Sequence, residues 1–169
     1  MTPTFRAPDS VGAPDPDRHA AMGLLLNAEA LAAASIEGRL PTPLRGKNIG
    51  ILCADAGSSA ATLFASAASE LGAHVVCIPI SLDDRSALTV IRETALLLSR
   101  LYDAVECLDM SPLLVELMQE SANVPLFFGL SSDAHWTAAL ATRMSRRSGL
   151  PSSARRHMLQ AALAQALPS

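Results

Sequence analysis

The sequence predicts a single α/β domain with an open, four-stranded parallel sheet covered by helices on both faces. Three observations lead to this prediction. Short apolar runs of strand length alternate with longer segments in which apolar residues recur at helical spacing. Strands that alternate with helices form right-handed crossovers, which place the strands in parallel. A chain of 169 residues has the length of one compact domain, and half of its residues are hydrophobic.

The N-terminal part of the chain divides into an arm and a helix. Residues 1–17 are rich in proline, glycine, alanine and aspartate and show no apolar period, which predicts a disordered arm. The folded domain is therefore expected over residues 18–169. Within it, residues 18–37 carry apolar side chains at helical spacing, and Gly38 is a typical helix stop.

The central unit of the chain is a strand, a tight turn and a helix between residues 44 and 72. Residues 48–54 form an apolar run that predicts a buried strand, and residues 55–57 form the turn. Ser58 or Ser59 is a suitable N-cap for the helix that follows. A helix start after a strand presents free backbone N–H groups, which attract phosphate or carboxylate. A plain capped helix with no ligand is the alternative interpretation.

The rest of the chain continues the alternation of strands and helices. Ser111 followed by Pro112 predicts a helix start, because serine caps helices and proline suits the first helical position. Gly149, Leu150 and Pro151 predict a break before the last helix. Strands are expected at residues 74–80, 104–108 and 124–128, and helices at residues 88–101, 112–121, 133–145 and 152–167.

Composition excludes several classes of function. A net charge of −3 argues against general nucleic-acid binding. Cys53, Cys77 and Cys107 lie in apolar runs without metal-ligand spacing, so we expect buried free thiols in the cytoplasm, with neither a metal nor another cofactor. We expect no membrane association, because no apolar stretch looks long enough to span a bilayer. Residues 20–35 are similar to the apolar part of a signal peptide, but acidic residues precede them.

A spaced set of residues in the central unit carries a family resemblance. The set fits, in register and without a gap, the carbamoyl-phosphate-binding element of the ornithine/aspartate carbamoyltransferase family, which it resembles. Its members are Leu44, Gly46, Lys47, Phe64, Leu71, Gly72 and His74.

Later segments extend this resemblance. Leu98-Ser-Arg-Leu-Tyr-Asp103 resembles the family's L-S-R-x-x-D, and Gly129-Leu130-Ser131 with His135 resembles its G-L-T-x-x-x-H. Residues 44–142 thus resemble the family's first domain, and residues 152–167 its closing N-R-x-H helix. The short link between them replaces the family's second domain, which recognises the amino-acid acceptor. The resemblance implies the strand order 2-1-3-4, with the N- and C-terminal helices packed together.

The chain departs from the family where the family binds phosphate. The five positions of the family's S-T-R-T-R signature are occupied by Gly57, Ser58, Ser59, Ala60 and Ala61. Both arginines of the signature are therefore absent, and Leu108 stands where the family has a further arginine. Each lost charge-assisted hydrogen bond is worth roughly 1.5–3 kcal/mol. Tight binding of carbamoyl phosphate is not expected.

A second part of the candidate site follows the fourth strand. His135 stands at the family's carbonyl-contacting histidine, and Thr137 matches the threonine of H-P-T-Q, whereas Trp136 and Ala138 replace its proline and glutamine. A histidine beside a helix start can equally be a capping or packing residue. The candidate site is a vestigial anion site that comprises Gly57, Ser58, Ser59, Ala60, Ala61, His135 and Thr137, with no catalytic residue assigned.

These features favour a carbamoyltransferase-like protein that has lost catalysis and acts as a binding or assembly module. Two alternatives stay open: an active carbamoyl- or carboxyl-type transferase whose remodelled site is completed by a partner, and a module that binds a small neutral or amino-acid-like ligand. The resemblance implies a homotrimer. We expect its contacts at the acidic loop of residues 81–88 and near Leu108 and Met110.

Arginines gather near the C-terminus. Arg143, Arg146, Arg147, Arg155 and Arg156 lie in or beside the last two predicted helices. We expect them to pair with acidic helices or to lie at an interface, and an anion-binding role is the alternative.

Overall fold

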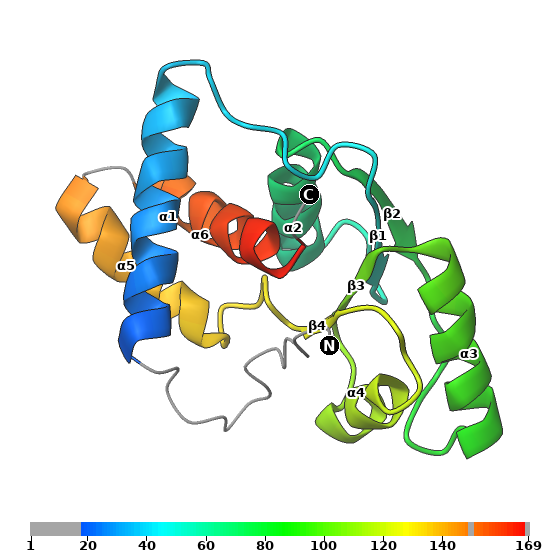
Figure 1. Cartoon of the computed structure of the whole chain (residues 1–169). Coiled ribbons are helices and arrows are strands. Elements are labelled where there is room, and N and C mark those ends of the chain that lie inside the picture. Colours follow the sequence, from blue (N-terminus) through cyan, green and yellow to red (C-terminus); the bar gives the residue numbers. More distant parts are fainter. Residues whose placement is uncertain (1–17, 149–150, 168–169) are drawn as a thin grey trace.

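The computed structural model describes residues 18–148 and 151–167, so the predicted disordered arm lies outside the described residues. Four strands form one parallel sheet in the order β2-β1-β3-β4, and the predicted fold class and strand order are confirmed (Figure 1). The strands are β1 (Asn48–Leu52), β2 (His74–Ile78), β3 (Ala104–Cys107) and β4 (Leu126–Phe128).

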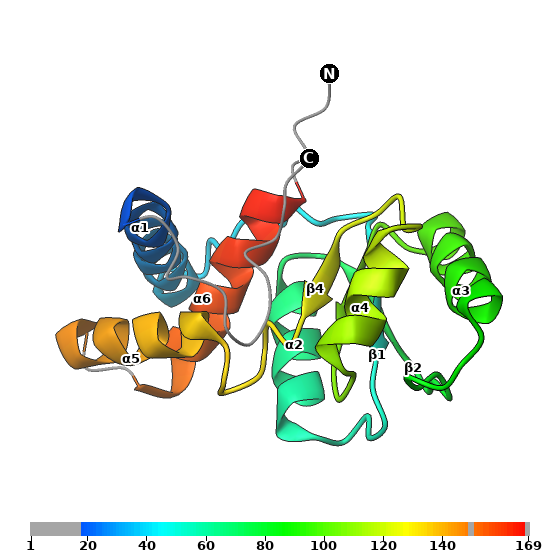
Figure 2. The same cartoon turned by 90° about the horizontal axis from the view of Figure 1, so that it is seen from below.

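Helices cover both faces of the sheet. Helices α2 and α6 lie against one face and helices α3 and α4 against the other, while α1 and α5 pack around α6 at one end of the molecule (Figure 2). The helices are α1 (Arg18–Ile36), α2 (Ser59–Glu70), α3 (Leu88–Leu101), α4 (Pro112–Gln119), α5 (Trp136–Ser148) and α6 (Pro151–Ala166). The predicted packing of the N-terminal helix against the C-terminal helix is confirmed.

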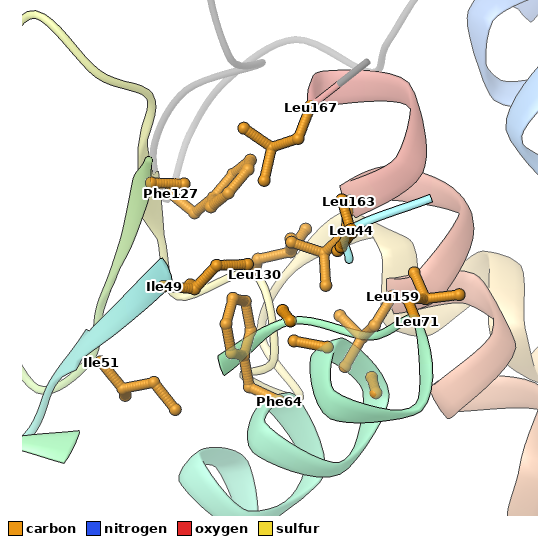
Figure 3. Close-up of a cluster of buried hydrophobic side chains, with 14 of the residues drawn as sticks. Leu44, Ile49, Ile51, Phe64, Leu71, Phe127, Leu130, Leu159, Leu163 and Leu167 are labelled. Atoms are coloured by element: carbon orange, nitrogen blue, oxygen red, sulfur yellow. The ribbon is translucent and has the colours of Figure 1, made fainter. Parts of the chain in front are cut away.

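The core between the sheet, α2 and α6 is the largest buried cluster of the described chain. The rings of Phe64 on α2 and Phe127 on β4 lie 6.4 Å apart between centroids, in a tilted arrangement. Leu159 and Leu163 bring α6 into the same cluster (Figure 3). The C-terminal helix is therefore a structural part of this domain and completes one face of its sheet.

Polar contacts fix the position of α6 beside α2. Gln160 donates from Nε2 to the Glu70 carboxylate at 2.8 Å, and Arg156 Nε lies 3.3 Å from the same carboxylate. Arg156 thus pairs with an acidic residue of a neighbouring helix, as predicted. Gly72 ends the α2 segment with a φ of +94°, in the left-handed region that favours glycine.

Helix α1 has an apolar composition but is buried only in part. It has 19 residues and a mean hydropathy of 1.3, so by length and composition it could cross a membrane, and the expectation that no stretch is long enough is wrong for this helix. Leu24, Leu25 and Ala28 are nevertheless buried against α5 and α6. Only 17% of this apolar stretch is buried inside the molecule, however, so the core contacts of α1 involve a minority of its residues.

Three further expectations need correction. Cys77 is only partly buried, because β2 is an edge strand. Leu108 is 4% exposed and belongs to the core, so it cannot form an intersubunit contact. Helix α5 begins at Trp136 rather than at residue 133, because residues 129–135 form two successive turns, in which Ser132 N–H donates to the Gly129 carbonyl and His135 N–H to the Ser132 carbonyl.

Candidate functional site

The carboxyl ends of the parallel strands meet at one edge of the sheet. In open α/β sheets, ligands bind in the crevice outside this edge. Both parts of the predicted site lie at this edge. One is the turn after β1, residues 55–61, and the other is the loop between β4 and α5, residues 129–137. We refer to them as the β1 turn and the β4 loop.

The β1 turn uses its own side chains to satisfy its backbone donors. Asp55 accepts a hydrogen bond at Oδ1 from Gly57 N–H at 2.8 Å, so an internal carboxylate occupies the place of an external anion. Ser58 is the N-cap of α2 and accepts from Ala61 N–H at 3.3 Å. At the start of α2, the N–H groups of Ser59 and Ala60 have no acceptor among the described residues.

The residues behind the β1 turn are apolar and buried. Ala61 is completely buried and Leu108, at the end of β3, is 4% exposed. Both belong to the cluster that also contains Cys53 and Leu130. The two positions at which the resemblance expects arginines are thus part of a packed hydrophobic core, and the third position, Ser59, is exposed to solvent.

The β4 loop has the opposite character, because it encloses a network of polar side chains. His135 Nδ1 lies 2.9 Å from Thr137 Oγ1 and accepts from Thr137 N–H at 3.3 Å. Because Nδ1 accepts, the ring is the neutral tautomer with its proton on Nε2. Burial, and to a lesser extent the nearby Arg155 guanidinium, lowers the pKa of His135 to about 4. His135 therefore caps the start of α5, in agreement with one of its two interpretations.

Arg155 of α6 joins this network from the other side. Its Nη1 donates to Thr137 Oγ1 at 2.7 Å, and its Nη2 donates to the carbonyl oxygens of Leu130 and Ser132, both at 2.8 Å. Burial lowers the pKa of the guanidinium, and the carboxylates of Asp133 and Glu106 oppose that shift. Arg155 therefore neither pairs with an acidic helix, as was predicted, nor presents its Nη atoms to an anion. It fastens α6 to the β4 loop.

Glu106 is the functional candidate that sequence reasoning missed. It lies on β3 and is completely buried, and its Oε1 accepts from both the N–H and the hydroxyl of Ser131. Burial raises the pKa of this carboxyl to about 8, although the bonds from Ser131 and the charge of Arg155 oppose the shift. Its Oε2 is buried and has no partner in the described chain. A charged residue inside an apolar strand run was the available signal.

The structure brings the predicted residues to one edge of the sheet but not into one network. His135, Thr137 and Arg155 are joined to one another, whereas no hydrogen bond within residues 18–148 and 151–167 connects them to the β1 turn. Of the remaining arginines near the C-terminus, Arg143, Arg146 and Arg147 are exposed on α5. The arrangement offers one weak set of backbone donors and one polar cluster that is bonded mostly within itself, in which Glu106 Oε2 and Arg155 Nε have no partner among the described residues.

No protein-family model matches the chain, but individual proteins do. It is 34% identical over 104 residues to ornithine carbamoyltransferase of Cutibacterium acnes, which covers 62% of this chain and 31% of that protein. It is 32% identical over 111 residues to ornithine carbamoyltransferase of Actinobacillus pleuropneumoniae, with 66% and 33% covered. The chain thus spans about a third of the length of the curated relatives it matches.

Solved structures show the same relationship. Ornithine carbamoyltransferase from Pyrococcus furiosus superposes with a TM-score of 0.65 at 25% identity, over 78% of this chain and 42% of that one. The catalytic subunit of aspartate transcarbamoylase from M. jannaschii superposes with a TM-score of 0.62 at 20% identity, over 80% and 45%. The sequence and structural neighbours of the chain are ornithine and aspartate carbamoyltransferases, and the predicted resemblance to part of such an enzyme is confirmed.

Proposed function

We propose that this chain, with carbamoyltransferase ancestry over about a third of its relatives' length, does not transfer carbamoyl groups and acts as a binding or assembly module. One observation carries the proposal: Ala61 and Leu108, which stand where the resemblance expects arginines, are buried in the hydrophobic core. The loss of positive charge is thus built into the packing of the domain. A single surface substitution would not reverse it.

The chemistry of carbamoyl transfer explains why this loss matters. A phosphate dianion has to be neutralised as it binds and as it leaves, and this electrostatic term is usually large. Here the β1 turn offers the N–H groups of Ser59 and Ala60, while the Asp55 carboxylate lies beside them and repels an anion. We infer a residual anion site at Gly57–Ala61 that binds phosphate or sulfate in the millimolar range.

The polar cluster of the β4 loop supports the same conclusion. To polarise a carbonyl group, the His135 imidazole would have to be held in the crevice beside a bound phosphate. Its Nδ1 caps α5, which leaves Nε2–H as the only donor of the ring, and Thr137 is engaged by Arg155. We infer that His135 and Thr137 serve the attachment of α6 to the β4 loop.

The proposed module is a homo-oligomer in the cytoplasm. Free thiols at Cys53, Cys77 and Cys107 fit a reducing compartment. The resemblance suggests a trimer, and of the contact regions predicted from the sequence, the loop of residues 81–88 is the one with mostly exposed residues. Leu108 has been removed from that set by its burial.

Activity assays on the purified protein test the proposal. With carbamoyl phosphate and either ornithine or aspartate, we expect neither citrulline nor carbamoyl-aspartate above the uncatalysed background. A P. furiosus ornithine carbamoyltransferase sample, assayed in parallel, controls for the quality of the substrates. Citrulline formation well above background that His135→Ala abolishes would contradict the proposal and favour the alternative of a remodelled active site.

A further inference from the structure

Helix α1 presents an apolar face to solvent. Its inner side packs on α5 and α6. On the opposite side Met22 is 49% exposed and Leu26 is 58% exposed, and exposed positions continue at helical spacing with Ala30 and Ala33. We refer to these four residues as the α1 outer face. None of the exposed residues between positions 20 and 36 carries a charge.

The composition of α1 indicates that this face has a cover. A helix that is apolar on every side is normally buried in a protein core or in a membrane. Helix α1 contains only two charged residues, Arg18 and Glu29, yet the core covers one side of it. The expectation of no membrane association rested on the lack of a long apolar stretch, and α1, with 19 residues and a mean hydropathy of 1.3, is such a stretch.

Helix α5 places three arginines beside α1. Arg143, Arg146 and Arg147 are exposed, and none of them forms an ion pair or a side-chain hydrogen bond with another described residue. Arg143 and Arg147 continue, at helical spacing, the flank of α5 that begins with Trp136 and Leu140. That flank packs in the cluster that α5 shares with α1. The last turns of α5 extend past α1 at the outer end of the molecule (Figures 1 and 2).

The charges of the domain are divided between its two ends. Helices α1, α5 and α6 together carry six arginines and one acidic residue, Glu29. Residues 81–120, which include α3 and α4 at the other end, carry eight acidic and three basic residues (Figure 1). The end with the α1 outer face is therefore the positive end. A second copy of this end would bring arginines against arginines, so the charges favour a negatively charged cover.

We propose that the end of the molecule formed by α1 and α5 binds the surface of an anionic lipid bilayer. Helix α1 lies in the plane of the membrane interface, with the α1 outer face among the acyl chains and Arg143, Arg146 and Arg147 at the level of the headgroup phosphates. The helix does not span the bilayer, because α5 and α6 hold its inner side. This attachment is separate from the proposed loss of activity, and it leaves the loop of residues 81–88 free for the proposed trimer.

Vesicle sedimentation of the full chain tests the proposal. Vesicles of phosphatidylcholine with about 30% phosphatidylserine provide the negative surface, and vesicles of phosphatidylcholine alone provide the neutral control. We expect binding to the anionic vesicles to be at least about tenfold stronger, and most of this preference to disappear at about 0.5 M salt. Absence of binding to the anionic vesicles, or equal binding to both kinds, would overturn the proposal. Protein that stays in the membrane after an alkaline carbonate wash would show a spanning helix and contradict the surface position of α1.

A leucine substitution tests the apolar part of the surface. Leu26→Glu places a carboxylate among the acyl chains, so we expect binding to the anionic vesicles to weaken at least about tenfold. Leu113→Glu is the matched control, because Leu113 on α4 is similarly exposed, at 54%, and should leave binding within about threefold of the original. Circular dichroism should show that both variants keep the fold. Equal binding by the two variants would overturn the role of α1.

Charge reversal tests the basic part. The double variant Arg143→Glu/Arg147→Glu should lose the preference for anionic vesicles, because the reversed charges repel the headgroups. Arg45→Glu/Arg100→Glu changes the net charge by the same amount at exposed positions outside α1 and α5, and should keep most of the preference. Equal losses in the two double variants would assign the effect to net charge and contradict the proposed contact.

The oligomeric mass without lipid distinguishes a membrane from a second copy as the cover of α1. We expect Leu26→Glu to leave the mass measured by analytical ultracentrifugation unchanged. A lower mass in this variant would show that the α1 outer face is an interface between copies of the chain, and would overturn the lipid proposal.

Discussion

The β1 turn and the β4 loop lie at the same edge of the sheet but differ in how they satisfy their polar groups. Behind the β1 turn, Ala61 and Leu108 fill the interior with apolar side chains. Inside the β4 loop, Arg155 and Glu106 remain buried and are hydrogen-bonded to the loop itself. The comparison shows that the Arg155 charge persists in the core where the fold supplies hydrogen-bond partners for it, whereas the Glu106 carboxyl, with one oxygen unpartnered in the described chain, keeps its proton.

The largest effect is expected when a charge is placed in the apolar interior behind the β1 turn. Leu108→Arg would bury a guanidinium among apolar side chains without a carboxylate, and we expect a loss of about 4 kcal/mol or more in the free energy of unfolding. Leu113→Arg places the same residue at an exposed position of α4 and should cost less than about 0.5 kcal/mol. Urea denaturation measures both. Equal stability of the two variants would show that the interior behind the turn accepts charge.

Removal of the charge from the β4 loop should have a smaller but still large effect. In Arg155→Ala the carbonyl oxygens of Leu130 and Ser132 and the Thr137 hydroxyl lose their donors, and we expect a loss of about 2–4 kcal/mol. Arg143→Ala, at an exposed position of α5, is the control. If urea denaturation gave similar midpoints for both variants, Arg155 would not hold α6 to the loop.

Burial of Glu106 should make the free energy of unfolding depend on pH. Its pKa is about 8 in the folded chain against 4.5 for an unperturbed glutamate, so the folded state keeps a proton that the unfolded state releases. Its contribution to stability is therefore full below about pH 4.5 and is lost as the pH rises to about 8, by an amount on the order of 2–5 kcal/mol. Glu106→Gln should flatten this part of the curve in denaturation experiments between pH 5 and 8. A slope that persists in the variant would assign it to another group.

The self-capped turn gives the smallest expected effect. The Asp55 carboxylate accepts a hydrogen bond from Gly57 N–H. Asp55→Asn therefore removes a negative charge near the N-terminus of α2. We expect sulfate binding to tighten by about three- to tenfold, still in the millimolar range. Calorimetric titration measures this change, with Asp83→Asn on a distant loop as the control. No difference between the two variants would show that the β1 turn does not bind anions.

Local sequence patterns predict most of this fold, because each element is bounded by its own signals. Helix α3 has the predicted bounds, and Ser58 and Ser111 cap α2 and α4 as expected. The start of β4 was placed two residues early although Pro125 directly precedes the strand, and that of α5 three residues early because residues 129–135 form turns. At the site, the turn and His135 could be identified by resemblance. The partners of Arg155 and the burial of Glu106 depend on how α6 docks, which no local pattern contains.

The affinity for carbamoyl phosphate tests the central claim most directly, namely that the β1 turn has lost its phosphate site to hydrophobic packing. Nuclear magnetic resonance titration of isotope-labelled protein would follow the amide signals of Ser59 and Ala60, which have no acceptor at the start of α2 among the described residues. We predict a dissociation constant of about 1 mM or weaker, because no guanidinium reinforces these donors. A micromolar constant, with shifts centred on the β1 turn and on His135, would contradict the account.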